Sequence, residues 1–187
     1  MRVIGVDPGN LVTGFGVISG EAARPRYVAA GAIRAVPASR AGERLKSIHD
    51  RLLGIIDEHA PLAMSLERSF VAANVQSAFR LGEARAMAML AAADRGLELF
   101  EYAPNEIKLT IAGHGHADKA QVKMMVRRAL GLDESVALSD DAADALAIAL
   151  CHLYRAREHH AAPSSGIRRV DFARGGRGRG PRIEALK

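Results

Sequence analysis

Four carboxylates occupy positions from which they could act together on a phosphate ester. Asp7 ends the first apolar run of the chain, and Glu67 ends a later one over residues 63–67. Asp141 and Asp144 lie three residues apart in a segment with helical spacing, so they share one face. Carboxylates in one cleft repel one another unless a cation neutralises them, and such clusters suit the hard ions magnesium and manganese. The sequence therefore predicts a magnesium-dependent enzyme that acts on phosphodiesters.

Each of these acids also has a structural explanation. The turn that follows Asp7 is a common β-turn sequence, and Glu67 alone could be a solvent-facing residue at a strand end. Ser139 fits the N-cap of a helix and puts Asp141 in the first turn, where the helix dipole favours negative charge. This explanation does not cover Asp144, whose neighbours are apolar, because an unpaired buried carboxylate is costly. Asp144 is therefore the better supported of the two helical acids.

Basic and glycine residues between the acids could contact a nucleic acid. Lys108 and Lys119 flank a loop over residues 113–116 and could hold a phosphate or stabilise charge in the transition state. Because this loop precedes a helix start, its backbone N–H groups, at Gly113 and Gly115 in particular, could also meet a phosphate. The two histidines of the loop suggest zinc, but no third ligand lies near them in the sequence. Packing of a glycine loop is the preferred explanation for that pair.

Length and composition indicate one globular domain with a tail. The chain has 187 residues, of which 49% are hydrophobic and 25% are charged, an ordinary globular mixture. Its single cysteine, Cys151, excludes a disulfide framework and indicates a reducing compartment. The first apolar run is interrupted by Asp7, and no apolar stretch reaches the ~20 residues of a membrane helix. We therefore expect a cytoplasmic protein with no signal peptide and no membrane partner.

The net charge of +5 comes from the C-terminal end. Residues 161–187 contain seven bases and two acids, which account for the whole net charge, so the preceding body is neutral. Glycine and arginine dominate residues 174–182, and no apolar residue repeats there, which predicts a basic and disordered tail over residues 158–187. The tail is either an electrostatic arm on nucleic acid or a solubilising extension, and the sequence does not separate the two.

The pattern of apolar residues predicts a mixed α/β domain over residues 1–157. Three strand-like runs joined by short turns should be antiparallel neighbours. Later strands follow helical crossovers, which make them parallel. The prediction is a mixed five-stranded sheet with an antiparallel start, flanked by helices. The five strands are expected over residues 3–6, 14–19, 27–33, 63–67 and 97–102, and the five helices over 39–58, 73–95, from about 104, from about 117, and 139–158.

The helix predicted over residues 73–95 is unusual because its second half is apolar almost all round. A surface helix of a monomer normally shows a polar face. One side can cover the sheet while the other meets a second copy, so a homodimer interface is preferred to burial under the later helices of the same chain. Phe70, just before this helix, either stacks on an unpaired base or closes the core at the helix entrance.

Taken in order, these motifs resemble the RuvC-type Holliday junction resolvases over residues 2 to about 155. The resemblance rests on Val6-Asp7-Pro8-Gly9 with Thr13-Gly14-Phe15-Gly16, Leu66-Glu67 with Phe70, Gly113 to Lys119, and Asp141 to Ala149. It implies an RNase H-like fold, a homodimer, and magnesium-dependent nicking of two opposed strands at a four-way DNA junction during recombination and repair. It also implies a partnership with the RuvA–RuvB branch-migration complex.

The resemblance assigns roles residue by residue. It gives the catalytic and metal-binding roles to Asp7, Glu67, Asp141 and Asp144. It gives the active-site lysines as Lys108 and Lys119, and the aromatic residue that enters the junction as Phe70. The residue at the position of Asp141 is a histidine in some relatives. The chain also departs from many relatives at Glu83 and Ala86, where they carry glutamine and glycine, and its tail lies outside the resemblance.

The expected mechanism is hydrolysis by in-line attack, with two Mg²⁺ ions about 4 Å apart and Mn²⁺ as a substitute. The products would carry 5′-phosphate and 3′-hydroxyl ends. Three other functions fit parts of the sequence: a nuclease that processes RNA ends on the same scaffold, a junction-binding module without catalysis, and an actin-like ATPase. The last is disfavoured by the chain length and by the lack of a second glycine-rich nucleotide motif. Cleavage of a synthetic four-way junction, compared with structured RNA, separates the remaining alternatives.

Overall fold

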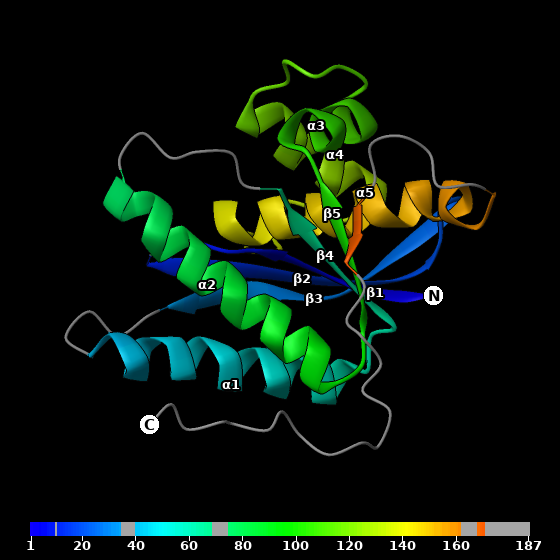
Figure 1. The fold of residues 1–187 in the computed structure, drawn as a ribbon. Coiled ribbons are helices and arrows are strands. Elements are labelled where there is room, and N and C mark those ends of the chain that lie inside the picture. Colours follow the sequence, from blue (N-terminus) through cyan, green and yellow to red (C-terminus); the bar gives the residue numbers. More distant parts are fainter. Residues whose placement is uncertain (10, 35–39, 69–74, 162–167, 171–187) are drawn as a thin grey trace, which may run out of the picture.

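A central sheet lies between two helical layers in the computed structural model (Figure 1). The structure describes residues 1–9, 11–34, 40–68, 75–161 and 168–170, of which 157–161 and 168–170 are described by their backbone only. None of the helices in these ranges has the length and apolar composition needed to span a bilayer.

The sheet is mixed and has the strand order β3-β2-β1-β4-β5-β6. Its antiparallel part consists of β1 (Arg2–Asp7), β2 (Val12–Glu21) and β3 (Arg24–Arg34). Parallel pairing then adds β4 (Ala63–Glu67) beside β1, and β5 (Glu98–Tyr102) beside β4. These five strands confirm the predicted mixed five-stranded sheet with an antiparallel start.

A short sixth strand, β6 (Arg168–Val170), pairs antiparallel with β5 at the edge of the sheet. This strand was not predicted, because the sequence around it lacks the alternation of apolar residues that marks a half-buried strand. The helix before it also continues beyond the predicted domain boundary at residue 157, to residue 161. The prediction of disorder for the rest of the tail falls on residues outside the description.

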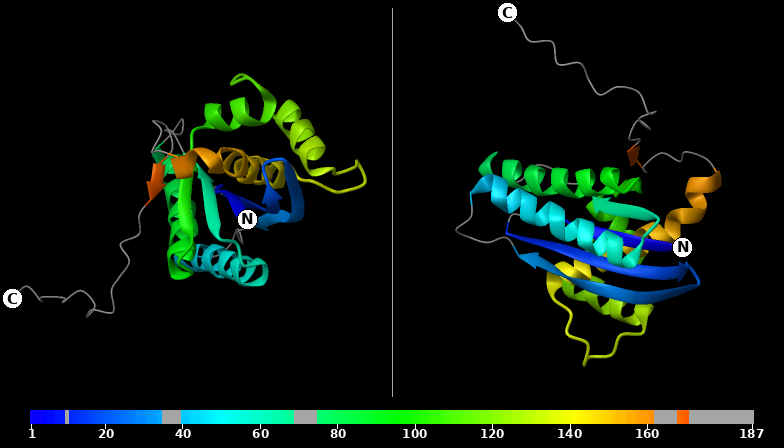
Figure 2. Two further views of the ribbon diagram at one scale, coloured as in Figure 1. Left: turned by 90° about the vertical axis from the view of Figure 1, so that its right-hand side faces the viewer. Right: turned by 90° about the horizontal axis from the view of Figure 1, so that it is seen from below.

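In the described part of the chain, helices cover both faces of the sheet (Figure 2). One face is covered by α1 (Ala41–His59) and α2 (Val75–Asp94), which share a core with the strands. The other is covered by α5 (Asp140–Ala161), against which α3 (Pro104–Ala112) and α4 (Lys119–Leu130) pack. The predicted helices are therefore all present, with ends displaced by a few residues.

Helical spacing of apolar residues explains the α1–α2 layer. Ile48, Leu52 and Ile56 recur every four residues along α1 and are buried. Strand alternation supplies the matching surface, because Ile4 and Val6 of β1 face this layer. Each buried aliphatic side chain contributes about 1.5–3 kcal/mol relative to its exposed state.

On the opposite face, α5 lies directly on the backbone of β1 and β2. A Cβ atom added to Gly5 would overlap the carbonyl oxygen of Ala145, and one added to Gly14 would overlap that of Asp141. One added to Gly16 would lie 2.8 Å from the Leu146 side chain. Because glycine has no side chain, α5 can approach the sheet closely. This approach determines how far Asp141 and Asp144 lie from the ends of the strands.

The outer surface of α2 exposes a stripe of apolar side chains. Val75, Phe79 and Leu90 have exposed fractions of 70%, 69% and 46%, whereas the alanines of the inner side are buried. The later helices lie on the other face of the sheet (Figure 1), so they do not cover this stripe. The alternative of burial under the later helices is therefore wrong, and the stripe remains available for another molecule.

Candidate active site

Three acids from three elements meet at the carboxyl ends of the central strands. Asp7 ends β1 and Glu67 ends β4, and the parallel register Val6↔Leu66 places the two acids one step further on, side by side. Helix α5 starts near the same strand ends and carries Asp144 in its second turn. All three line a pocket of about 330 Å³. The structure thus brings together three of the four acids that the sequence singles out.

The fourth acid, Asp141, lies at the margin of this cluster. It belongs to the first turn of α5, and it is not among the described residues that line the pocket. Its charge still contributes to the raised pKa of Asp7, as the smallest of the contributions. Asp141 is therefore near enough to interact with Asp7 through space, but it faces the pocket less directly than Asp144.

Burial and mutual repulsion make this cluster electrostatically unfavourable. Burial raises the pKa of Asp7 to about 7, with repulsion from Asp144 and Glu67 adding to the shift and Lys119 opposing it. Burial also raises the pKa of Glu67, again with repulsion from Asp144 and opposition from the lysines. A cation placed among these carboxylates would relieve both effects, and an all-oxygen donor set is the one that magnesium prefers.

Lys119 already supplies one positive charge to the cluster. Its Nζ donates to Asp144 Oδ2 at 3.2 Å, and attraction to that carboxylate raises the pKa of Lys119. In the part of the chain that is described, no three acids, histidines or cysteines converge closely enough to form a ready-made metal site. The Lys119 side chain is 81% exposed, so its ammonium can move away from Asp144 when a metal ion binds there. The carboxylates of Asp7, Glu67 and Asp144 line the same pocket, so the donor set fits a divalent ion, although its members are more widely spaced than in a ready-made site.

A charged network fixes helix α3, which brings Lys108 to the pocket. The Glu106 carboxylate accepts a hydrogen bond from the Ala103 backbone N–H at 2.7 Å, at the start of α3. It also accepts one from Arg155 of α5 at 2.9 Å and lies 3.8 Å from Arg68, the residue after Glu67. Helix α3 is thereby tied to α5 and to the end of β4, and Lys108 lines the same pocket as the acids.

The glycine loop lies between α3 and α4. Gly113 ends α3 with φ of 82°, a conformation that favours glycine, and the Gly113 and His114 positions are exposed. The start of α4 is capped by Asp118, which accepts the Gln121 N–H at 2.8 Å. The predicted phosphate contact would therefore involve the backbone of the loop, including Gly115, more than the capped helix start. Phe70 lies outside the described residues, so its predicted role is not placed.

Two functional candidates were not singled out by the sequence analysis. Arg85 of α2 donates to the Glu67 carbonyl oxygen at 2.8 Å and forms an ion pair with Glu101 of β5. Glu101 is 3% exposed. A partial signal was available, because Arg85 and Glu101 each lie directly between apolar residues, and buried charges are nearly always paired.

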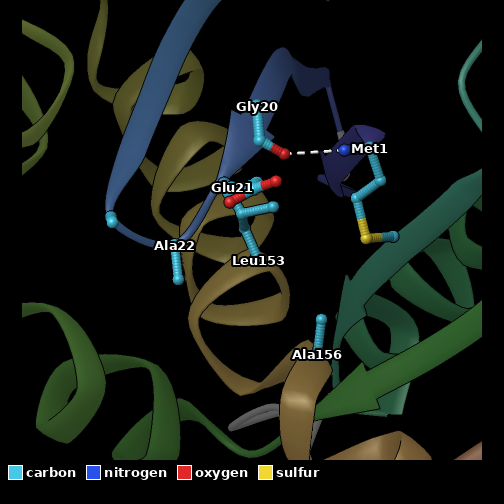
Figure 3. A pocket seen from close by; sticks show the side chains of 7 residues that line it. Met1, Gly20, Glu21, Ala22, Leu153 and Ala156 are labelled. Atoms are coloured by element: carbon cyan, nitrogen blue, oxygen red, sulfur yellow. Dashed lines mark hydrogen bonds between the residues drawn. The ribbon is translucent and has the colours of Figure 1, made fainter.

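A second pocket, of about 470 Å³, lies at the opposite end of β1 (Figure 3). Its wall includes Met1, Leu153 and Ala156, and the Met1 amino group donates to the Gly20 carbonyl oxygen at 2.6 Å. Glu21 is the one acidic side chain among its described lining residues. This pocket lacks grouped ionisable side chains, so it does not compete with the carboxylate pocket as a catalytic site.

Comparison with known proteins gives consistent matches over most of the chain. The family model "Crossover junction endodeoxyribonuclease RuvC" matches residues 3–152. Proteins of that name from Alkalilimnicola ehrlichii and Hydrogenovibrio crunogenus are 45% and 46% identical over 155 and 151 residues, which cover 83% and 81% of this chain and 92% and 86% of theirs.

Solved structures agree with these matches. T. thermophilus RuvC in complex with a Holliday junction substrate has a TM-score of 0.80 and 37% identity, over 85% of this chain and 96% of that chain. The yeast mitochondrial Holliday junction resolvase Ydc2 has a TM-score of 0.59 and 14% identity, over 84% of this chain and 82% of that chain, and so supports the fold alone.

Proposed function

The chain belongs to the RuvC family of crossover junction endodeoxyribonucleases, and we propose on this basis that it resolves Holliday junctions during recombination and DNA repair. It has the RNase H-like fold of that family, and it is a hydrolytic nuclease that depends on a divalent metal ion. The observation that carries the proposal is the meeting of Asp7, Glu67 and Asp144 in one pocket with two lysines. Paired, symmetric nicking of opposed strands is the reaction that follows.

We assign catalysis and metal binding to Asp7, Glu67 and Asp144, with Asp141 as a fourth acid. The raised pKa of Asp7 and the all-carboxylate donor set support Mg²⁺, two ions per site, with Mn²⁺ as a substitute. When bound, these ions would activate water and neutralise charge on the phosphate. The three acids line the pocket at the ends of β1 and β4 and at the start of α5. The expected products carry 5′-phosphate and 3′-hydroxyl ends.

The lysines of the pocket are assigned to the DNA backbone. Lys119 reaches the acids from the start of α4 and is mostly exposed, so it can exchange its contact with Asp144 for one with a phosphate. Lys108, from α3, is placed to hold the same or a neighbouring phosphate. Gly113 and Gly115 are proposed to contact the backbone through their N–H groups. The role of Phe70 as an aromatic residue that enters the junction remains a proposal from the family resemblance.

A homodimer is proposed through the exposed stripe of α2. Val75, Phe79 and Leu90 offer apolar surface on one helix, and exposed apolar surface of this kind is typical of protein interfaces. A C2 dimer suits a four-way junction, because each protomer presents one pocket to one of two equivalent strands. Nicking by both protomers gives the paired cuts that resolution needs.

The other partners follow from the family. We propose cooperation with the RuvA–RuvB branch-migration complex, a cytoplasmic location and no membrane partner. The basic tail is proposed to be an electrostatic arm on DNA, supported by its share of the net charge. Removal of residues 171–187, which carry five bases, should then make the plot of log affinity against log salt less steep, by up to about 4.5 units of slope. An unchanged slope would identify the tail as a solubilising extension.

A gel assay on a mobile synthetic four-way junction tests the proposed function. We expect paired nicks with Mg²⁺, none in EDTA, and none with Asp144→Asn under either condition. Equal-length duplex DNA and structured RNA serve as competing substrates. Faster cleavage of structured RNA would support the RNA-processing alternative, and binding without metal-dependent nicking would support a silent junction-binding module.

A further inference from the structure

Arg85 reaches the catalytic edge of the sheet from the face opposite α5. It lies on α2, and its guanidinium donates to the main-chain oxygen of Glu67 at 2.8 Å. Its side chain is 18% exposed. This hydrogen bond joins a side chain of α2 to the backbone of a proposed catalytic acid. The contact is made at the last residue of β4, where the strand gives way to the loop that leads to α2.

A buried carboxylate holds this arginine in place. Glu101 of β5 is 3% exposed and forms an ion pair with the Arg85 guanidinium. β5 is the neighbour of β4, and the register pairs Leu66 with Glu101, so the arginine spans the ends of two adjacent strands. A planar guanidinium can donate to both acceptors at once in a fixed geometry, which an ammonium group cannot.

The alternation of side chains separates this contact from the pocket. Leu66 belongs to the core shared with α1 and α2, whereas the Ser65 hydroxyl donates to the Ile148 carbonyl oxygen of α5 at 3.3 Å. By the same alternation, Glu67 directs its carboxylate toward α5, where it lines the pocket with Asp144. Arg85 therefore holds the backbone of Glu67 from one face of the sheet while the carboxylate is presented on the other.

We propose that Arg85, held by Glu101, is a positioning residue that fixes the end of β4 so that the Glu67 carboxylate is set for a divalent ion. This rests on the proposed function, because it presumes that Glu67 binds metal. A carboxylate at a strand end next to a loop has freedom to rotate and shift with its backbone, and partners outside the ligand set typically change metal affinity or activity by about 10–100-fold. Arg85 does not touch the substrate or the ion in this role.

The test uses a double substitution, R85M/E101L, in the full-length protein. Replacement of both partners by apolar residues of similar size avoids an unpaired buried charge and so keeps the fold. We expect the single-turnover nicking rate at saturating protein to fall about 10–100-fold, with junction affinity within about twofold of wild type. We also expect Mn²⁺ affinity of the DNA-free protein, read from the electron paramagnetic resonance signal of the free ion, to fall about tenfold or more. Arg85→Lys retains the charge but loses the planar guanidinium, so its nicking rate and its Mn²⁺ affinity should both lie between those of wild type and R85M/E101L.

A matched control comes from another ion pair of the same helix. Arg44 of α1 pairs with Glu83 of α2, two residues before Arg85, and this pair joins the two helices to each other. R44M/E83Q should leave the nicking rate and the Mn²⁺ affinity within about twofold of wild type, as expected for a change outside the metal site. A loss of Mn²⁺ affinity in this control equal to that of R85M/E101L would overturn the positioning role, since any disturbance of α2 would then suffice.

Two results separate this inference from the proposed function. If Glu67→Gln abolishes nicking while R85M/E101L and Arg85→Lys keep wild-type rate and Mn²⁺ affinity, the positioning role is wrong and the active site stands. If Glu67→Gln nicks junctions at the wild-type rate, the proposed active site itself is wrong. Should R85M/E101L fail to fold by circular dichroism, Arg85→Lys decides by the same two readouts.

Discussion

Asp7→Asn should make the metal-free protein more stable while it abolishes nicking. In the folded protein, burial and repulsion from neighbouring acids raise the pKa of Asp7 from 3.8 to about 7. Asparagine has nearly the same shape but carries no charge, so it removes the repulsion. The same substitution removes a ligand on which the proposed reaction depends. Junction affinity should stay nearly unchanged, because phosphate contacts by basic and backbone groups dominate affinity.

The magnitude follows from the pKa difference. Between pH 3.8 and about 7 the folded protein keeps a proton on Asp7 that the unfolded chain has released, so stability falls as the pH rises through this window. The full difference corresponds to about 4 kcal/mol at about 1.4 kcal/mol per pKa unit. Asp7 is only partly covered, so water screens part of the repulsion and we expect about 2–4 kcal/mol at neutral to alkaline pH.

Urea denaturation in EDTA measures the difference. The stability advantage of Asp7→Asn over wild type should grow by about 1–3 kcal/mol between about pH 5 and about pH 8. Added Mg²⁺ should stabilise the wild type and not the variant, because only the wild type gains binding free energy. A variant that is less stable than wild type at alkaline pH without metal, or that nicks junctions in Mg²⁺, would refute the reasoning.

Three further outcomes are expected. Gly5→Ala adds a methyl group that overlaps a backbone carbonyl of α5, so it should lower the free energy of unfolding, measured in urea, by about 1–3 kcal/mol. Gly54→Ala, with open space around it in α1, should be neutral or stabilising. An equal loss of stability in both variants would contradict the close approach of α5 to the sheet. Lys119→Met should lower the single-turnover nicking rate about 100-fold. Lys46→Met, which replaces an exposed lysine of α1, should leave that rate unchanged. Similar rates for the two variants would show that Lys119 has no role in the reaction. Phe79→Asp should convert a dimer to a monomer in sedimentation experiments, and an intact dimer would exclude the α2 stripe as the interface.

Most of the fold could be predicted from local patterns. The apolar spacing that predicted α1 is the set of residues that α1 buries, and the short turns between the first strands enforced antiparallel pairing. β6 could not be predicted, because its pairing with β5 depends on backbone hydrogen bonds at a sheet edge and leaves little trace in side-chain pattern. The direction in which α2 turns its apolar stripe also required the tertiary structure, since both sides of that helix are apolar.

The site was predictable where position along an element determined it. Asp7 and Glu67 end parallel neighbours, so their proximity followed once those strands were paired. Asp141 and Asp144 share a helix face by sequence spacing, but the way α5 rests on Gly5 and Gly14 decides which of them enters the pocket. Contacts such as that of Arg85 with the Glu67 carbonyl join residues whose sequence separation carries no rule, and only the folded chain reveals them.

Helix α2 carries two features on its two sides: the uncovered apolar stripe and the arginine that holds the Glu67 backbone. If a second copy packs on the stripe as proposed, dimerisation would stiffen α2, the helix whose Arg85 holds the backbone of a proposed metal ligand in each protomer. In an isolated protomer the active site would then be less rigid. Full nicking activity would then require both protomers of the proposed dimer, so single, unmatched cuts would be rare.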